Sequence, residues 1–203
     1  MIPEGRLSTT LVTGLYLDPE DQQKFPLVSH ERGPIAIEDT SEGLLYQNWV
    51  MTYVAGDLVA APEDTGSPSI VLTVADIIFV SFTFDQNARI TITYSTLTSS
   101  YIYWYDSSLG MTVTTDLGSD VITPSIFLDD KRDTQNGVND MLLWYTKSEG
   151  GGTYELFMLR QRDRFLTEYS MATGLTAPYI YNLGMSSELR IQLSLYATPP
   201  RLR

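Results

Sequence analysis

The 203-residue sequence contains no cysteine and only one histidine. Without cysteine the chain can form neither a disulfide framework nor a thiolate metal site, and it has no thiol nucleophile. A single histidine is too few for the usual zinc ligand sets. It also leaves His30 as the sole imidazole base for a serine nucleophile. His30 lies in a polar stretch of the N-terminal segment, where we expect a surface residue and not a catalytic one.

Long apolar runs are missing as well. Apolar runs such as 77–80 fall far short of the ~18 consecutive apolar residues that a membrane-spanning helix requires. The first residues lack a basic stretch followed by an apolar one, so we expect no secretory signal. Glycine-rich nucleotide-binding loops of the Gly-x-Gly-x-x-Gly or Gly-x-x-x-x-Gly-Lys type do not occur. The sequence therefore predicts no membrane insertion, no cofactor and no catalytic motif.

Charged residues make up only 19% of the chain, and the net charge is −12. Residues 1–130 hold 4 Lys or Arg and 18 Asp or Glu, a balance of −14, whereas residues 131–203 hold 9 and 7, a balance of +2. This field argues against nucleic acid as a partner of the N-terminal part. It allows head-to-tail contact between the acidic and basic ends of neighbouring copies. The alternative is that the acidity serves solubility alone.

Aromatic residues are abundant, with 13 Tyr, 7 Phe and 3 Trp, and together with β-branched residues they favour strands. Residues 77–84 place Ile78, Val80, Phe82 and Phe84 on one face, which is the period-two pattern of a strand. No segment gives a convincing helix. The best candidate, 161–171, contains poor helix formers and also fits a strand. We expect strands at 45–53, 58–61, 69–74, 77–84, 89–95, 101–105, 111–115, 126–128, 141–146, 154–160 and 189–196.

These patterns predict an all-β fold, either an antiparallel sandwich or a propeller-like array of short hairpins. We expect residues 1–43, which are rich in turn formers, to form an irregular N-terminal segment or arm, and residues 44–203 to form the all-β domain. That domain contains an internal repeat. Residues 90–105 match 141–158 at an offset of 51, so that Tyr94 aligns with Tyr145, and a fainter copy spans 48–61. Units of this length are typical of propeller blades, although chance similarity of hairpins is the alternative.

Two clusters are candidates for binding. Tyr101, Tyr103 and Tyr105 share one face of a strand, which could serve as a protein interface or as a platform for sugar rings, or could simply pack against other strands. The arginines of the second cluster could dock onto an acidic neighbour or end a strand in solvent. They are Arg160, Arg162 and Arg164.

An acidic loop, 129–140, offers carboxylate oxygens of the kind that calcium prefers. Its spacing does not match an EF-hand, and Lys131 and Arg132 repel a cation, so we expect a solvated turn and no metal site. A glycosidase needs only two carboxylates at a set separation, and among 25 acidic residues no pair can be selected.

Several segments together resemble virion proteins of short-tailed bacteriophages. They are 84–89, the Tyr-Trp-Tyr strand 103–105, Asp129 to Arg132, and 159–165. The resemblance covers residues 44–196 and implies a homo-oligomeric tail or neck subunit, made in the host bacterial cytoplasm and carried in the virion. Its partners would be other copies of itself and other virion proteins. We therefore expect a structural protein and not an enzyme, with a carbohydrate-binding module as the second hypothesis and a glycosidase as the third.

Overall fold

The computed structural model describes residues 27–34, 46–62, 69–85, 87, 89–129, 140–185 and 191–198. Most of these residues lie in antiparallel strands, so the prediction of an all-β antiparallel fold is confirmed. Among the described residues there is no α-helix, and only the short 3-10 turn η2, Gln161–Asp163, is helical. No helix in this part of the chain is long and apolar enough to cross a membrane.

The strands form four sheets, in each of which consecutive strands pair side by side. Sheet I contains β1 (Leu27–Pro34), β2 (Tyr46–Val54), β3 (Asp57–Pro62) and β4 (Ser69–Thr73). Sheet II contains β5 (Ile77–Phe84), β6 (Ile90–Thr96), β7 (Ser100–Asp106) and β8 (Met111–Gly118). Sheet III contains β9 (Val121–Asp129), β10 (Asp140–Gly150), β11 (Thr153–Arg160) and β12 (Tyr169–Leu175). Sheet IV is a hairpin of β13 (Tyr179–Met185) and β14 (Ile191–Tyr196).

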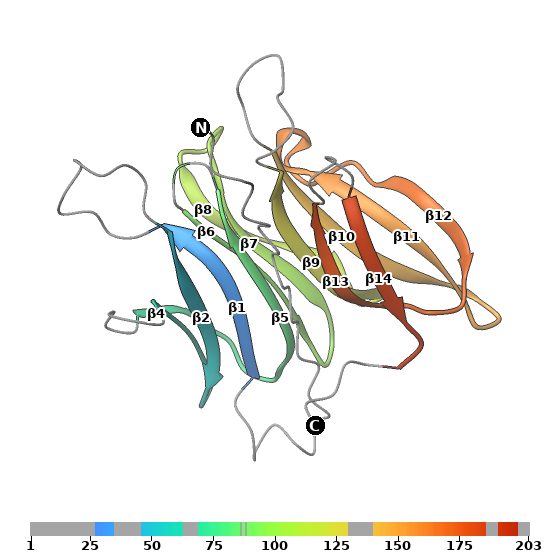
Figure 1. The fold of residues 1–203 in the computed structure, drawn as a ribbon, viewed down its shortest axis with the longest axis horizontal. Helices are drawn as coiled ribbons and strands as arrows, with labels where there is room; N and C mark the ends of the chain where they lie inside the picture. The colour runs from blue at the N-terminus through green and yellow to red at the C-terminus, as the bar shows by residue number, and fades with distance from the viewer. Residues whose placement is uncertain are drawn as a thin grey trace, which may run out of the picture.

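The sheets follow one another as layers, from sheet I in blue and teal to sheet IV in red (Figure 1). The first strands of successive sheets are in contact, with β1 against β5, β5 against β9, and β9 against β13. The opposite end of each sheet is formed by β4, β8, β12 or β14, and no further strand pairs with these four free edges among the described residues. The internal repeat coincides with this arrangement, because its copies cover β2–β3, β6–β7 and β10–β11, the middle pair of each four-stranded sheet.

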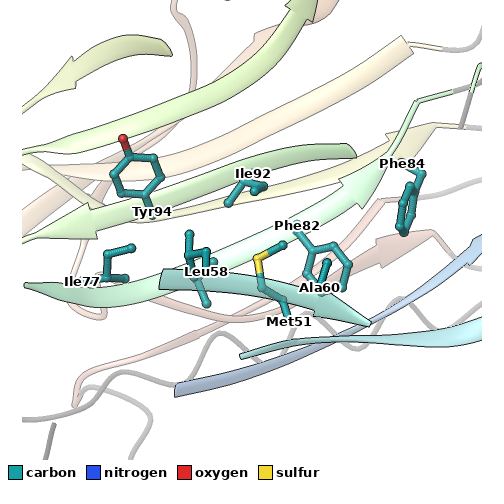
Figure 2. Close-up of a cluster of buried hydrophobic side chains, with 9 residues drawn as sticks. Met51, Leu58, Ala60, Ile77, Phe82, Phe84, Ile92 and Tyr94 are labelled. Atoms are coloured by element: carbon teal, nitrogen blue, oxygen red, sulfur yellow. The ribbon is translucent and has the colours of Figure 1, made fainter. Parts of the chain in front are cut away.

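Three hydrophobic cores separate the four layers. The first lies between sheets I and II, where Met51 and Leu58 of sheet I meet Phe82 of sheet II (Figure 2). The second lies between sheets II and III around Trp104, and the third lies between sheets III and IV around Trp144. Sheets II and III therefore bury apolar side chains on both faces. Alternation of apolar and polar residues along their strands consequently does not distinguish a solvent-exposed face from a buried one.

Part of the contact between sheets II and III is made by hydroxyl groups. The side chains on this face of β5 and β6 include Ser81, Thr83, Thr91, Thr93 and Ser95, all buried. Thr93 Oγ1 donates to the carbonyl of Pro124 on β9, and the backbone N–H of Ile126 donates to Ser81 Oγ at 3.2 Å. Because buried polar groups are costly unless they are hydrogen-bonded, these pairs fix where β9 lies against sheet II.

The structure differs from the expected strands at three places. Strand β1 lies within the segment predicted to be irregular, and its polar sequence gives little sign of a strand until it pairs with β2. Strand β12 was not among the expected strands, and the segment 161–171, a poor helix candidate that also fitted a strand, contains a 3-10 turn and then the start of β12. Strand β13 was not expected, and it forms by pairing with β14.

Candidate functional site

The three tyrosines of β7 lie on the face of sheet II that is turned toward sheet I. Each is half-buried, whereas Ile102 and Trp104 on the opposite face are buried in the second core. Tyr101 stacks on Tyr94 with ring centroids 5.2 Å apart, and Tyr103 packs against the first core. This face is therefore engaged in packing between layers, which leaves less open ring surface than a flat sugar platform would offer.

Tyr105, the third of these tyrosines, is covered by a cation. The guanidinium carbon of Arg89 lies 3.7 Å from the centroid of the Tyr105 ring, within the range of a cation–π contact. Arg89 is positioned by the turn that precedes it, where its backbone N–H donates to Asp85 Oδ1 at 2.8 Å. The same carboxylate oxygen accepts the N–H of Asn87 at 2.8 Å, so a buried aspartate holds two backbone N–H groups between β5 and β6.

Two of the three clustered arginines pair with buried aspartates of their own chain. Arg162 Nε lies 2.5 Å from Asp140 Oδ2 at the start of β10. Arg164 Nη2 lies 2.6 Å from Asp106 Oδ2 and thus connects sheet III to the end of β7 in sheet II. The aspartate side chains are almost fully buried, but about half of each arginine side chain remains exposed. The acidic partner predicted on a neighbour is thus present within the chain, and docking to a second copy stays a prediction.

Arg160, the remaining member of the cluster, belongs to a smaller network on sheet III. Its Nη2 lies 2.8 Å from Asp163 Oδ2, and it also donates to the hydroxyl of Tyr169, over whose ring its guanidinium stands. Hydrogen bonds from the Tyr169 hydroxyl and from Arg160 lower the pKa of Asp163. The network holds η2 against the first residue of β12, which makes it a structural clamp.

A further ionic cluster, which the sequence did not single out, lies at the outer end of β10. Lys147 Nζ contacts Glu168 Oε1 at 2.7 Å and Asp120 Oδ2 at 3.6 Å, and the Tyr145 hydroxyl donates to Glu168 at 2.5 Å. Glu168 and Asp120 each lie more than twenty positions from Lys147, so no local spacing in the sequence could reveal the cluster.

The pKa values in this cluster move away from neutral pH. Burial and then the bond to Glu168 raise the pKa of Tyr145. Although burial alone would lower it, the hydrogen bond to Glu168 raises the pKa of Lys147. Burial alone would raise the pKa of Glu168, but the hydrogen bonds from Lys147 and Tyr145 outweigh this effect and lower it. A general acid or base works best with a pKa near the operating pH, so the shifts favour a fixed ionic contact over proton transfer.

Other residues weighed in the sequence are placed only in part. His30 lies in β1, paired with Val50, and its side chain lies outside the described residues. Most of the acidic loop, 130–139, also lies outside them, and its flanking residues Asp129 and Asp140 face each other across β9 and β10. Within the described part of the chain, no three acidic or histidine side chains come together as metal ligands.

A pocket of about 200 Å³ opens at one end of the contact between sheets II and III. The β6–β7 turn and the first residues of β9 form its walls, and Phe79 of β5 and Tyr179 of β13 also line it. Seven of its lining residues carry a serine or threonine hydroxyl, and none is charged: Ser95, Thr96, Thr98, Ser99, Ser100, Ser119 and Thr123. Sequence reasoning missed this pocket because its walls come from four separate segments.

Comparisons with known proteins give no family. No protein-family profile and no curated protein matches the chain. Two solved structures, the calcium and iodide structures of Trichoderma reesei Carbohydrate-Active Enzymes Family AA12, are similar at 13% and 14% identity with a TM-score of 0.27 each. They cover 69% and 68% of this chain, which spans 35% and 36% of theirs. A similarity at that score carries no argument about this protein.

Proposed function

We propose that this protein is a structural assembly subunit that joins other copies of itself, and other structural proteins, through the free edges of its sheets. The observation that carries the proposal is the composition of the edge strands β4, β8, β12 and β14. Together they contain one charged residue, Asp116, and no lysine, arginine or proline. Soluble β proteins commonly protect free edges with such residues, because unpaired N–H and C=O groups otherwise pair with another chain.

The four edges differ in regularity. Strand β12 carries two register irregularities against β11, and β4 carries one against β3 near its middle. An irregularity of this kind twists an edge away from an incoming strand. By contrast, β8 pairs regularly with β7 from Met111 to Asp116, and the irregularity between β13 and β14 falls at Ile180 and Asn182 of the inner strand. Strands β8 and β14 are therefore the edges best suited to add a strand from a second copy.

The biological setting that we propose is the virion of a short-tailed bacteriophage, where the chain would be a tail or neck subunit. The resemblance of residues 44–196 to such virion proteins supports this setting. So does a layered β scaffold whose ionic clusters are engaged in clamps between strands and layers. In this role the protein acts by burial and strand pairing at interfaces, with no reaction of its own.

The test is the mass of the purified chain in solution, measured by light scattering and native mass spectrometry over a wide concentration range. We expect oligomers, and we expect Thr114→Lys on β8 or Ser194→Lys on β14 to shift the chain toward monomer, because both residues are exposed on regular edges. Met171→Lys on the irregular edge β12 is the matched control. A chain that stays monomeric at every concentration, or a control that dissociates the oligomer equally, would contradict the proposal.

A further inference from the structure

The pocket between sheets II and III lies where three sheets meet, and its lining includes Ser119, which directly follows the edge strand β8. The turn joining β6 to β7 and the start of β9 face each other across it, and Tyr179 at the start of β13 brings in sheet IV. Its volume of about 200 Å³ corresponds to about six or seven water molecules at the density of the liquid. A site of this size accommodates one small molecule or one unit of a larger chain.

The chemistry of the lining selects an uncharged ligand rich in hydroxyl groups. No lining residue carries a charge, so an ionic group in the pocket would lack a counter-charge, and burying it would be unfavourable. A hydroxyl can both donate and accept a hydrogen bond, which makes a ring of serine and threonine side chains complementary to another set of hydroxyls. Most small-molecule pockets are predominantly apolar, so this composition argues against an apolar ligand.

Several lining hydroxyls are held in place by the fold. Ser95 Oγ and Ser100 Oγ lie 2.8 Å apart, and Ser100 Oγ also donates to the carbonyl of Val121 at 3.0 Å. Thr123 Oγ1 accepts the N–H of Ile180 at 2.9 Å. These three hydroxyls are almost fully buried, so they fix the walls of the pocket, and a ligand would meet the more exposed hydroxyls of the lining. Among those, Thr96 Oγ1 is itself held in place, because it donates to the carbonyl of Ser99 at 3.1 Å.

Thr123 also has an unusual backbone. Its φ is +44°, a conformation that is rare for a β-branched residue and is maintained here by neighbouring bonds. Ser125 Oγ donates to the Thr123 carbonyl at 3.1 Å, and the pairing of β9 with β10 shifts register at this point. Thr123 thus lines the pocket from a strained, irregular point within β9, and strained backbone of this kind is common at binding sites.

The pocket has an apolar side as well. Tyr179 and Ile122, both partly exposed, supply apolar lining, whereas Phe79 is almost fully buried. A pyranose ring presents C–H groups on its faces and hydroxyls around its rim, so it matches an aromatic surface flanked by hydroxyl side chains. We propose that this pocket binds one neutral sugar ring, either free or as a unit of a glycan.

Two carboxylates near the pocket rim bear on whether the pocket would bind a neutral or an acidic sugar. Asp116 accepts a hydrogen bond from Ser99 at 2.6 Å, and Asp120 follows Ser119 directly in the chain. Asp120 is paired with Lys147, so the carboxylate of Asp116 is the one whose negative charge disfavours an acidic sugar at the pocket mouth. Glucose, galactose, mannose and N-acetylglucosamine are therefore the neutral probes, and glucuronate is the acidic comparator.

The experiment is saturation-transfer NMR on the full chain with each free sugar, followed by titration of the best one and of a short oligosaccharide that contains it. Thr98→Val removes one exposed hydroxyl of the lining, and we expect it to weaken binding about 2- to 10-fold, the loss that corresponds to one hydrogen bond. Ser119→Trp places a bulky ring at the mouth and should abolish binding. Thr112→Val, an exposed threonine outside the pocket, is the matched control and should bind normally.

Three results would overturn the inference: no saturation transfer to any neutral sugar, equal binding of glucuronate, or an equal loss in the Thr112→Val control. Circular dichroism melts of each variant ensure that a loss of binding reflects the pocket and not unfolding. The inference is independent of assembly, because a monomeric chain that binds the sugar would support it while contradicting the proposed function.

Discussion

Replacement of Thr93 by valine tests the hydroxyl contact between sheets II and III. The side chain of Thr93 is completely buried, and valine has nearly the same shape, so the change removes the hydroxyl while leaving the packing almost intact. The hydroxyl donates to the carbonyl of Pro124 on β9 and lies 3.3 Å from the carbonyl of Ser81. In the variant the Pro124 carbonyl, itself buried, loses this donor.

The expected loss follows from the cost of a buried group left without its partner, about 1–3 kcal/mol. For a domain of this length, a loss of about 2 kcal/mol lowers the melting temperature by roughly 4–8 °C. The same substitution at Thr112, which is exposed on β8, should change stability by less than about 0.5 kcal/mol. Urea unfolding followed by circular dichroism measures both variants, with equal slopes indicating that the unfolded state is unchanged.

A second variant, Ser81→Ala, removes the acceptor for the N–H of Ile126 and tests whether the contact acts as a unit. Because both hydroxyls hold the same segment of β9, the double variant should lose less stability than the two single losses added together. The reasoning would be refuted if Thr93→Val destabilised the chain no more than Thr112→Val. In that case the position of β9 against sheet II would depend on the apolar cores alone.

Three further predictions concern stability. Hydrogen bonds from Ser108 and Arg164 lower the pKa of Asp106, so this carboxylate stabilises the fold above about pH 4, and that contribution disappears as the pH falls through its lowered pKa. Asp106→Asn should reduce the loss of unfolding free energy at acid pH, which is measured by urea unfolding at several pH values. Burial raises the pKa of Tyr94 to about 12, above the roughly 10 of an unfolded tyrosine. Stability should fall as the pH rises between these values, and Tyr94→Phe should reduce that fall; absorbance at 295 nm follows the ionisation. Phe82→Ala should lose about 3–5 kcal/mol in chemical unfolding, because its ring is almost fully buried in the first core.

The strands of sheet II illustrate what alternation can and cannot predict. The range 77–84 is the observed strand β5, because aromatic and β-branched residues strongly favour this conformation. The assignment of faces was wrong at its start. Ile77 is buried in the first core and Ile78 is only half-buried, since the pairing with β6 shifts register between Ile77 and Phe79. A bulge of this kind exchanges the two faces on which the following side chains lie, and the local sequence pattern does not predict it.

The serine and threonine residues of β5 and β6 show a second limit. Alternation of Thr91 and Thr93 with isoleucine suggests a strand with a wet face, yet both threonines are buried and Thr93 bonds to β9. Which face is covered depends on the neighbouring layer, and that layer begins some thirty residues later in the chain. For the same reason the pocket, whose lining comes from β5, the β6–β7 turn, β9 and β13, could not be found from spacing alone.

The arginine cluster shows a third case. The density of Arg160, Arg162 and Arg164 in one segment correctly suggests pairing with carboxylates, because guanidinium groups suit that geometry. The partners that the structure supplies are Asp163, which is close in sequence, and two aspartates that are 22 and 58 positions away. Only the folded arrangement brings the distant pair close, so the sequence could indicate the type of partner but not its identity.

Hydrogen–deuterium exchange of the oligomer against the diluted monomer tests the central claim, assembly through free sheet edges, most directly. We expect the backbone amides of β8 or β14 to exchange more slowly in the oligomer, because pairing with a second copy would occupy N–H groups that are free in the monomer. The amides of the irregular edge β12 should exchange at the same rate in both states. Slower exchange confined to turns or to β12, with β8 and β14 unchanged, would contradict the account.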